Sequence, residues 1–390
     1  MIHQLKCHNL FMLLVVMVIG VFISSCAPEV RKPLSQLDTP EHHTYTGLKL
    51  LKHGKYRDAE REFELAIQLD PKYSKAYVGL GLTKAYKRNF ESAFDLMKDA
   101  WQCAGTKEEK VFVHVGKIRL YTMSKEKEIW LKRAEEQFKY AIALDPKSCA
   151  SYYFMGIAYK GGLEFDLAGK MFSKVLDLNE DYVEEADSEW KLIQKIQRAM
   201  PGTITGKKIA IVESITRADA AALFMEEFKI DVLYQRRTLK TFDTSFKDPD
   251  KFKAESKKKT FTAADIADHP LKADIEGILE IGVRGLENYP DGAFHPDELI
   301  TRAAYAMMIE DILIKVTGEK DLATKFIGSA SPFPDLRPDL SYFNAVVVVT
   351  SRGIMQAKDF TTGEFAPLSS VSGVDALLII RKMKEQLKFF

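Results

Sequence analysis

Residues 47–71, GLKLLKHGKYRDAEREFELAIQLDP, decide the fold of this chain, because the spacing of their small residues returns further along the sequence. The recurring pairs lie 34 residues apart and are Gly47 and Gly81, Ala59 and Ala93, Ala66 and Ala100, Ala134 and Ala168, and Phe138 and Phe172. Extra residues fall around 124–129 in the third copy. A period of this length predicts helical hairpins, which stack because one hairpin cannot bury its apolar face alone.

This pattern resembles the tetratricopeptide repeat over about residues 40–180. In that repeat, glycine and alanine let neighbouring helices approach closely, and a proline ends the unit, as Pro71 and Pro146 do here. The resemblance implies four hairpins within residues 42–200, with the amphipathic stretch Tyr182–Met200 as a capping helix. Stacked hairpins of this family leave a concave groove, so the resemblance also implies a protein or peptide partner.

The N-terminus has the pattern of an export signal. Its apolar run, Leu10–Ile23, is shorter than the about 20 residues that a membrane span needs. Ile23-Ser24-Ser25-Cys26 resembles the lipobox of bacterial lipoproteins, in which the cysteine is lipidated and becomes the mature N-terminus. We expect a signal peptide at 1–25, lipid on Cys26 and a Pro-rich, polar tether at 26–41. An uncleaved anchor helix is the alternative.

Two further features bear on the compartment. Ala27 follows the lipobox cysteine where inner-membrane lipoproteins commonly have aspartate, which points to a lipid anchor in an outer membrane. Cys103 and Cys149 remain after the first two cysteines are assigned. We expect them as small core residues, although an oxidising compartment would permit a disulfide between them.

A second repeat occupies residues 201–390, after Pro201-Gly202. Ile215-Thr216-Arg217-Ala218 returns 85 residues later as Ile300-Thr301-Arg302-Ala303, at the start of a helix in each case. A third copy follows at a spacing of 71, and its matched pairs are Gly282 and Gly353, Phe294 and Phe365, and Pro296 and Pro367. Residues 207–212 (KKIAIV) read as a strand. The charged residues around 234–260 read as a solvated, basic insert, and a contact with anionic headgroups or a teichoic-like polymer is the alternative.

Local signals support this division. Thr216 and Asp219 have the spacing of a helix capping box. Asp291-Gly292 is a turn signal, since glycine accepts a positive φ. The change of repeat type predicts proteolytic cuts near Pro201-Gly202 and, within the charged insert, near Lys257.

This second pattern resembles the S-layer homology domain over about residues 205–385. The resemblance implies a pseudo-threefold, helix-rich domain with short strands, which binds cell-wall glycans, often pyruvylated, in grooves between copies. It implies that Arg217 and Arg302 contact the anionic glycan. Thr216 and Thr301 would then cap helices near that site, and Asp291 and Gly292 would shape the turn beside it.

The third copy departs from the family, because Gly373 stands where the arginine is expected. The family's usual tryptophan is absent as well, since no tryptophan follows Trp190. In the glycan-binding interpretation, Arg302→Ala weakens wall binding and leaves the melting temperature nearly unchanged. In the alternative, Arg217 and Arg302 pair with carboxylates inside the bundle and bind nothing.

Composition and the absence of catalytic motifs narrow the range of possible functions further. The net charge of +1 does not favour nucleic-acid binding, and the chain carries no nucleophile, phosphate-loop or metal-ligand motif. We therefore expect a mainly α protein that is not an enzyme and needs no cofactor or metal. The expected function is that of a cell-envelope scaffold, with a protein partner in the first region and wall polysaccharide on the second. The alternative is an outer-membrane assembly or secretion accessory lipoprotein, in which the second region is only structural.

Overall fold

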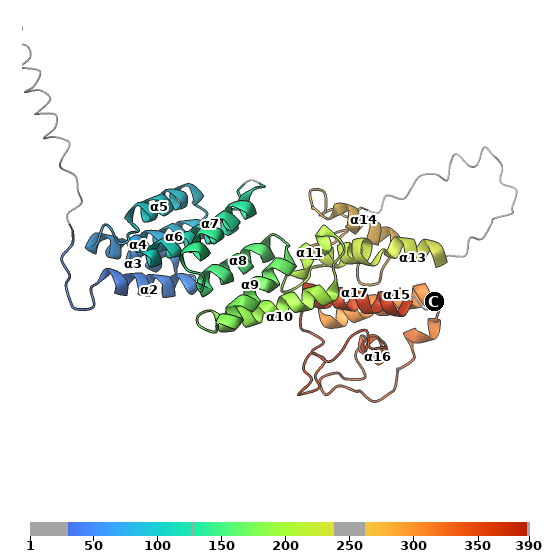
Figure 1. Cartoon of the computed structure of the whole chain (residues 1–390). Coiled ribbons are helices and arrows are strands. Elements are labelled where there is room, and N and C mark those ends of the chain that lie inside the picture. Colours follow the sequence, from blue (N-terminus) through green and yellow to red (C-terminus); the bar gives the residue numbers. More distant parts are fainter. Residues whose placement is uncertain (1–29, 127, 238–261, 388–390) are drawn as a thin grey trace, which may run out of the picture. The chain divides into compact units, whose positions relative to one another are not determined.

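The computed structural model describes residues 30–126, 128–237 and 262–387 (Figure 1). The expected signal peptide, Cys26, and most of the basic insert with Lys257 lie outside these residues. The described residues are mainly helical, which confirms the predicted fold class. They divide into two compact units, with the division between Trp190 and Lys191.

Unit 1 consists of helical hairpins, as the repeat predicts (Figure 1). The hairpins are α2 (Pro40–Lys52) with α3 (Tyr56–Leu69), α4 (Ser74–Tyr86) with α5 (Phe90–Cys103), α6 (Lys107–Ser124) with α7 (Trp130–Leu144), and α8 (Cys149–Gly161) with α9 (Phe165–Leu178). Helices α2, α4, α6 and α8 also pack against one another in that order, so each hairpin covers the apolar face of the next. The additional residues of the third copy fall between α6 and α7, as expected.

Small residues make this stacking possible. All seven alanines of the repeat are fully buried; they are Ala59, Ala66, Ala93, Ala100, Ala134, Ala141 and Ala168. Gly47 faces the ring of Phe63, and a Cβ there would lie 2.7 Å from Cε1 of that ring. Gly156 faces Phe172 in the same way, at 2.6 Å. A side chain at either glycine would therefore force the two helices of its hairpin apart.

The segment before α2 differs from the expected tether, because residues 30–38 pack against the first hairpin. The Arg31 amide donates to the carbonyl of Gln68, at 2.8 Å. The buried Asp38 carboxylate accepts from the Leu34 amide at 2.6 Å and from the Arg31 guanidinium. The hydrogen bond from Leu34, followed by those of His43 and Arg31, lowers the pKa of Asp38 to about 2.

Unit 2 is also built from helices. They are α11 (Ile204–Ala210), α12 (Arg217–Ala222) continuing as the π-helical η1 (Leu223–Phe228), α13 (Ile230–Arg237), α14 (Lys272–Ile281), α15 (Arg302–Thr317), the 3-10 turn η2 (Lys320–Ala323), α16 (Phe343–Ser351) and α17 (Gly373–Leu387). The predicted strand at 207–212 was wrong, since most of it lies in α11. The Thr203 hydroxyl caps this helix by accepting from the Gly206 amide, and a short apolar run alone does not distinguish a strand from a helix.

The three copies in unit 2 are arranged around an approximate threefold axis. Helix α11 packs against α17, α14 against α12, and α16 against α15, so each copy covers the next. At the centre, the Ile215 amide donates to Val371, the Val371 amide to Ile300, and the Ile300 amide to Ile215, at 2.8, 3.2 and 3.0 Å. The only β pairing among the described residues consists of two isolated bridges, which join Thr216 to Leu299 and Thr301 to Ser370.

The boundary between the units differs from the one expected at 200/201. It falls inside α10 (Val183–Ala199), the helix expected as the cap.

The expected cut site at Pro201-Gly202 is also held in place. The buried Glu227 carboxylate accepts from the amides of Gly202 and Thr203, at 3.0 and 2.8 Å, and from the Thr203 hydroxyl at 2.8 Å.

We therefore expect Glu227→Ala to expose a cleavage site that the native chain lacks. The variant loses three charge-assisted hydrogen bonds, at a cost of about 3 kcal/mol in the stability of unit 2. Limited proteolysis should cut at residues 201–203 in the variant only. Glu213→Ala, at an exposed position, is the control. Equal cleavage of the native chain at these residues would contradict the prediction.

Candidate functional site in the second unit

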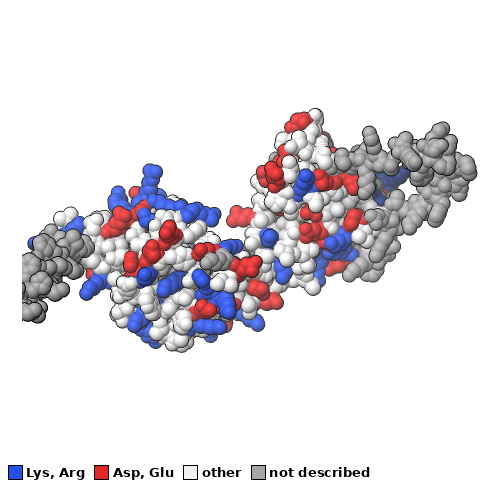
Figure 2. Space-filling model, turned by 90° about the horizontal axis from the view of Figure 1, so that it is seen from above, with Lys and Arg blue, Asp and Glu red and all other residues white. Residues whose placement is uncertain are grey.

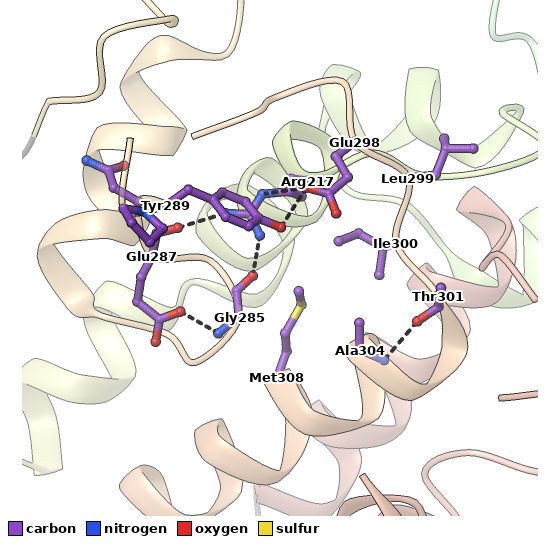
Figure 3. Close-up of a pocket in the computed structure, with 12 residues that line it drawn as sticks. Arg217, Gly285, Glu287, Tyr289, Glu298, Leu299, Ile300, Thr301, Ala304 and Met308 are labelled. Atoms are coloured by element: carbon purple, nitrogen blue, oxygen red, sulfur yellow. Dashed lines mark hydrogen bonds and ion pairs between the residues drawn. The ribbon is translucent and has the colours of Figure 1, made fainter. Parts of the chain in front are cut away.

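The first groove of unit 2 lies between its first and second copies and has a volume of about 360 Å³. We call it the Arg217 groove, and Figure 3 shows Arg217 next to Tyr289 and Glu298. Its lining residues are Arg217, Gly285, Glu287, Asn288, Tyr289, Pro290, Glu298, Leu299, Ile300, Thr301, Ala304 and Met308.

Arg217 is buried, and each of its three guanidinium nitrogens donates to a backbone carbonyl. Nε donates to the carbonyl of Phe294 at 2.8 Å, Nη1 to Gly285 at 2.6 Å and Nη2 to Glu287 at 2.8 Å. The guanidinium also lies over the ring of Tyr289, 4.8 Å from its centre. Arg217 thus holds the loop after α14 in place, and its main partners are carbonyls rather than the carboxylates of the alternative interpretation.

The Arg217 groove is poorly suited to an anion. Two carboxylates, Glu287 and Glu298, line it together with the single cation of Arg217. The Tyr289 hydroxyl donates to Glu298 at 2.7 Å, and this hydrogen bond to a carboxylate is the main cause of the raised pKa of Tyr289. A negatively charged ligand would therefore meet net negative charge here.

Arg302 occupies the equivalent position in the second copy. Its Nε donates to the carbonyl of Phe365 at 2.8 Å and its Nη2 to Gln356 at 2.6 Å, while the guanidinium lies 4.5 Å from the centre of the Phe365 ring. Burial lowers the pKa of this guanidinium. Within the described residues, Nη1 of Arg302 makes no hydrogen bond. Arg302 also lines a second groove, which is larger than the Arg217 groove.

This Arg302 groove has a volume of about 810 Å³. Its described lining comprises Lys195, Arg198, Arg302, Gly353, Ile354, Met355, Gln356, Ala357, Lys358, Phe360, Asp375, Leu378, Ile379, Arg381, Lys382 and Glu385. Six of these residues are cationic and two are carboxylates, so the groove carries net positive charge. Its electrostatics are therefore opposite to those of the Arg217 groove.

The two carboxylates of the Arg302 groove pair with only part of its positive charge. Asp375 lies 3.6 Å from Lys195, and Glu385 lies 3.1 Å from Arg381 and 3.2 Å from Lys382. Within the described residues, neither Arg198 nor Lys358 has a carboxylate within ion-pair distance, and both are exposed. These two cations are available to a ligand in the groove.

Phe360 is a groove residue that sequence analysis missed. Its side chain is 77% exposed, although it lines the Arg302 groove. It lies 71 residues after Tyr289, the aromatic residue of the Arg217 groove, so the repeat spacing could have identified it. An exposed ring of this kind can stack on a sugar, and it occupies the groove despite the missing tryptophan of the family pattern.

The other predicted site residues have structural positions. Thr216 caps α12 and forms the expected capping box with Asp219, while Thr301 caps α15 and lines the Arg217 groove. Asp291 and Gly292 form the predicted turn, in which Gly292 has a φ of +80° and the Ala293 amide donates to Asp291. Neither of these two turn residues lines the Arg217 groove or the larger groove around Arg302.

The third copy has no equivalent arginine because α11 fills that space. The Gly373 amide donates to the carbonyl of Val212 at 3.0 Å, and a Cβ on Gly373 would overlap the carbonyl of Ile209. Glycine is thus required by packing at the position where the other two copies have arginine. Neither the Arg217 groove nor the Arg302 groove therefore has a counterpart at Gly373.

Unit 1 presents an aromatic cluster on α5, α6 and α7. The His114 ring lies 5.0 Å from that of Trp101 and 5.5 Å from that of Tyr140, and Lys117 lies over Trp101. Trp101 and Tyr140 are exposed, while burial lowers the pKa of His114.

Among the charged side chains visible in Figure 2, lysines and arginines alternate with acidic residues, so no face of a single charge sign stands out in this view.

Other kinds of site are not found in the described part of the chain. It contains no group of three or more His, Cys, Asp or Glu side chains placed to hold a metal ion. No helix in it has both the length and the hydropathy that crossing a membrane requires. Cys103 and Cys149 are free thiols; Cys149 is buried and Cys103 is partly buried.

These contacts overturn the expectation that Arg302→Ala leaves the melting temperature nearly unchanged. The substitution removes the donor from the carbonyl of the buried Phe365 and from that of Gln356, so we expect a loss of about 2 kcal/mol. Arg217→Ala, which affects three carbonyls, should cost about 3 kcal/mol. Hydrogen exchange of peptides from unit 2 measures both losses. The exposed Arg337→Ala is the control, and an effect of the groove variants as small as its effect would refute the structural role.

Comparison with protein-family models and with curated proteins finds no match to this chain. The family resemblances noted above therefore rest on this chain's own residues and spacings.

Proposed function

We propose that this chain is a lipid-anchored scaffold of a bacterial cell envelope, which binds anionic wall polysaccharide in the Arg302 groove and a protein partner on unit 1. The observation that carries this proposal is the composition of the Arg302 groove. It combines a large open volume, net positive charge, two exposed cations without carboxylate partners and an exposed phenylalanine ring. Cations hold acidic groups, and an aromatic ring offers an apolar face to a sugar.

The proposal assigns Arg302 a different role from the one that the resemblance implies. Its Nε and Nη2 hold the groove wall, and only Nη1 is left to face a ligand. Lys358 and Arg198 then carry most of the binding, since neither contributes an ion pair to the fold within the described residues. Substituting them tests binding without removing a buried contact.

We expect Arg198→Glu with Lys358→Glu to weaken binding to purified, polysaccharide-bearing sacculi at least about tenfold, because two attractive charges become repulsive. Phe360→Ala should weaken it less. Lys320→Glu, an exposed lysine outside the groove, is the charge control. Sedimentation with sacculi at low and high salt measures the effect, and it should shrink as salt screens the charges. Equal binding by the native chain and the double variant would refute the groove assignment.

The lipid anchor requires a separate test, because Cys26 lies outside the described residues. Cys26→Ser should abolish incorporation of a fatty-acid analogue and leave a soluble or uncleaved precursor. Metabolic labelling of cells that express the native chain or the variant measures this. Undiminished label on the variant would end the lipoprotein assignment, while leaving the groove assignment open to the sacculus experiment.

The second candidate function is an assembly or secretion accessory lipoprotein. Two observations favour it: the buried arginines serve the fold of unit 2, and unit 1 exposes the aromatic residues Trp101 and Tyr140. In that case, sacculi do not bind the chain at all. Trp101→Ala with Tyr140→Ala would instead impair the capture of a protein partner.

A further inference from the structure

The segment before α2 contains a hydrogen-bonded turn with exposed apolar side chains. Asp38 fixes it, since its carboxylate accepts from the Leu34 amide and from Arg31, and lies 2.8 Å from Nε2 of His43. The Asp38 amide donates in turn to the carbonyl of Ser35. Arg31 also pins the segment to the end of α3 through Gln68. We call residues 30–38 the Leu34 turn.

The apolar side chains of the Leu34 turn point away from this framework. Leu34 is 86% exposed, the highest value for a large hydrophobic residue in the described part of the chain. Leu37 is 69% exposed and Val30 is 54% exposed. Lys32 between them is exposed as well. Two leucines and a valine held open to water by a hydrogen-bonded turn indicate a surface that is covered by something else.

The length of chain before the turn identifies what covers it. Only three residues separate Cys26 from Val30, so their Cα atoms can lie at most about 14 Å apart even when the chain is fully extended. A lipid on Cys26 would place that residue at the membrane surface. The Leu34 turn would then lie within reach of the interface, where apolar side chains insert about 5–10 Å. The cation of Lys32 suits anionic headgroups.

We propose that the Leu34 turn inserts into the bilayer that holds the lipid anchor, with Leu34 and Leu37 in the interface and Lys32 at the headgroups. This inference rests on the proposed lipidation of Cys26. It replaces the tether expected at residues 26–41 with a short link, so that the first hairpin lies against the membrane. The occupant is the lipid surface itself, and neither a protein partner nor a second copy is required.

An environment-sensitive dye tests this insertion. The full chain is expressed in cells, and the mature protein is purified and reconstituted into vesicles of phosphatidylethanolamine and phosphatidylglycerol. In a Cys103→Ser background, where Cys149 stays buried, the dye is attached at Leu34→Cys or, as a control, at Tyr140→Cys. Tyr140 is also exposed, at 58%, but lies on α7. We expect a blue shift at position 34, quenching there by a lipid-borne quencher, and neither effect at position 140.

The outcomes separate this inference from the proposed anchor. If the protein floats with the vesicles but the dye at position 34 behaves like the dye at 140, the inserted turn is refuted and the anchor stands. A blue shift at 34 that the lipid-borne quencher does not affect also overturns it, because a protein surface then covers the turn. If the protein carries no lipid and does not float, both proposals fail. Quenching confined to position 34 supports insertion.

Discussion

The ring of three backbone hydrogen bonds among Ile215, Ile300 and Val371 is the constraint on which unit 2 depends. Each of these residues immediately precedes the residue that caps a helix, namely Thr216, Thr301 and Ser372. Because each amide is satisfied by the next copy, no copy can shift along the axis without leaving a buried donor unpaired. The ring therefore sets where α12, α15 and α17 begin, and hence where the side chains of their first residues point.

The residue that follows the helix cap differs between the three copies. Arg217 and Arg302 both reach the carbonyl of a buried phenylalanine in the following copy, whereas Gly373 leaves room for α11. The charge of the grooves has diverged further. The positive charge of the Arg302 groove comes largely from α10 and α17, which supply Lys195, Arg198, Arg381 and Lys382. The same scaffold thus produces one net negative and one net positive groove.

Sequence periodicity predicted the hairpins of unit 1 and the caps and turn of unit 2, because these depend on local steric requirements. Gly47 must be small against Phe63, and Gly292 needs a positive φ, whatever surrounds them. The groove charges could not be predicted in this way, since Arg198 lies in a helix that periodicity assigned to the cap of the first region. The role of Arg302 was also missed, because the carbonyls that it binds belong to residues 54 and 63 positions later in the chain. The docking of residues 30–38 likewise depends on contacts with Gln68 and His43, which the repeat spacing does not reveal.

The difference in charge between the two grooves has a consequence for adhesion. If only the Arg302 groove holds an anionic polymer, each molecule attaches to the wall at a single point, and one such contact exchanges readily. A polysaccharide, however, presents the same acidic group many times along its length. Chains confined to a membrane by their lipids would then engage one polymer together, at a high local concentration. Strong attachment would be a property of the population, set by the surface density of the protein, while each individual contact stays reversible.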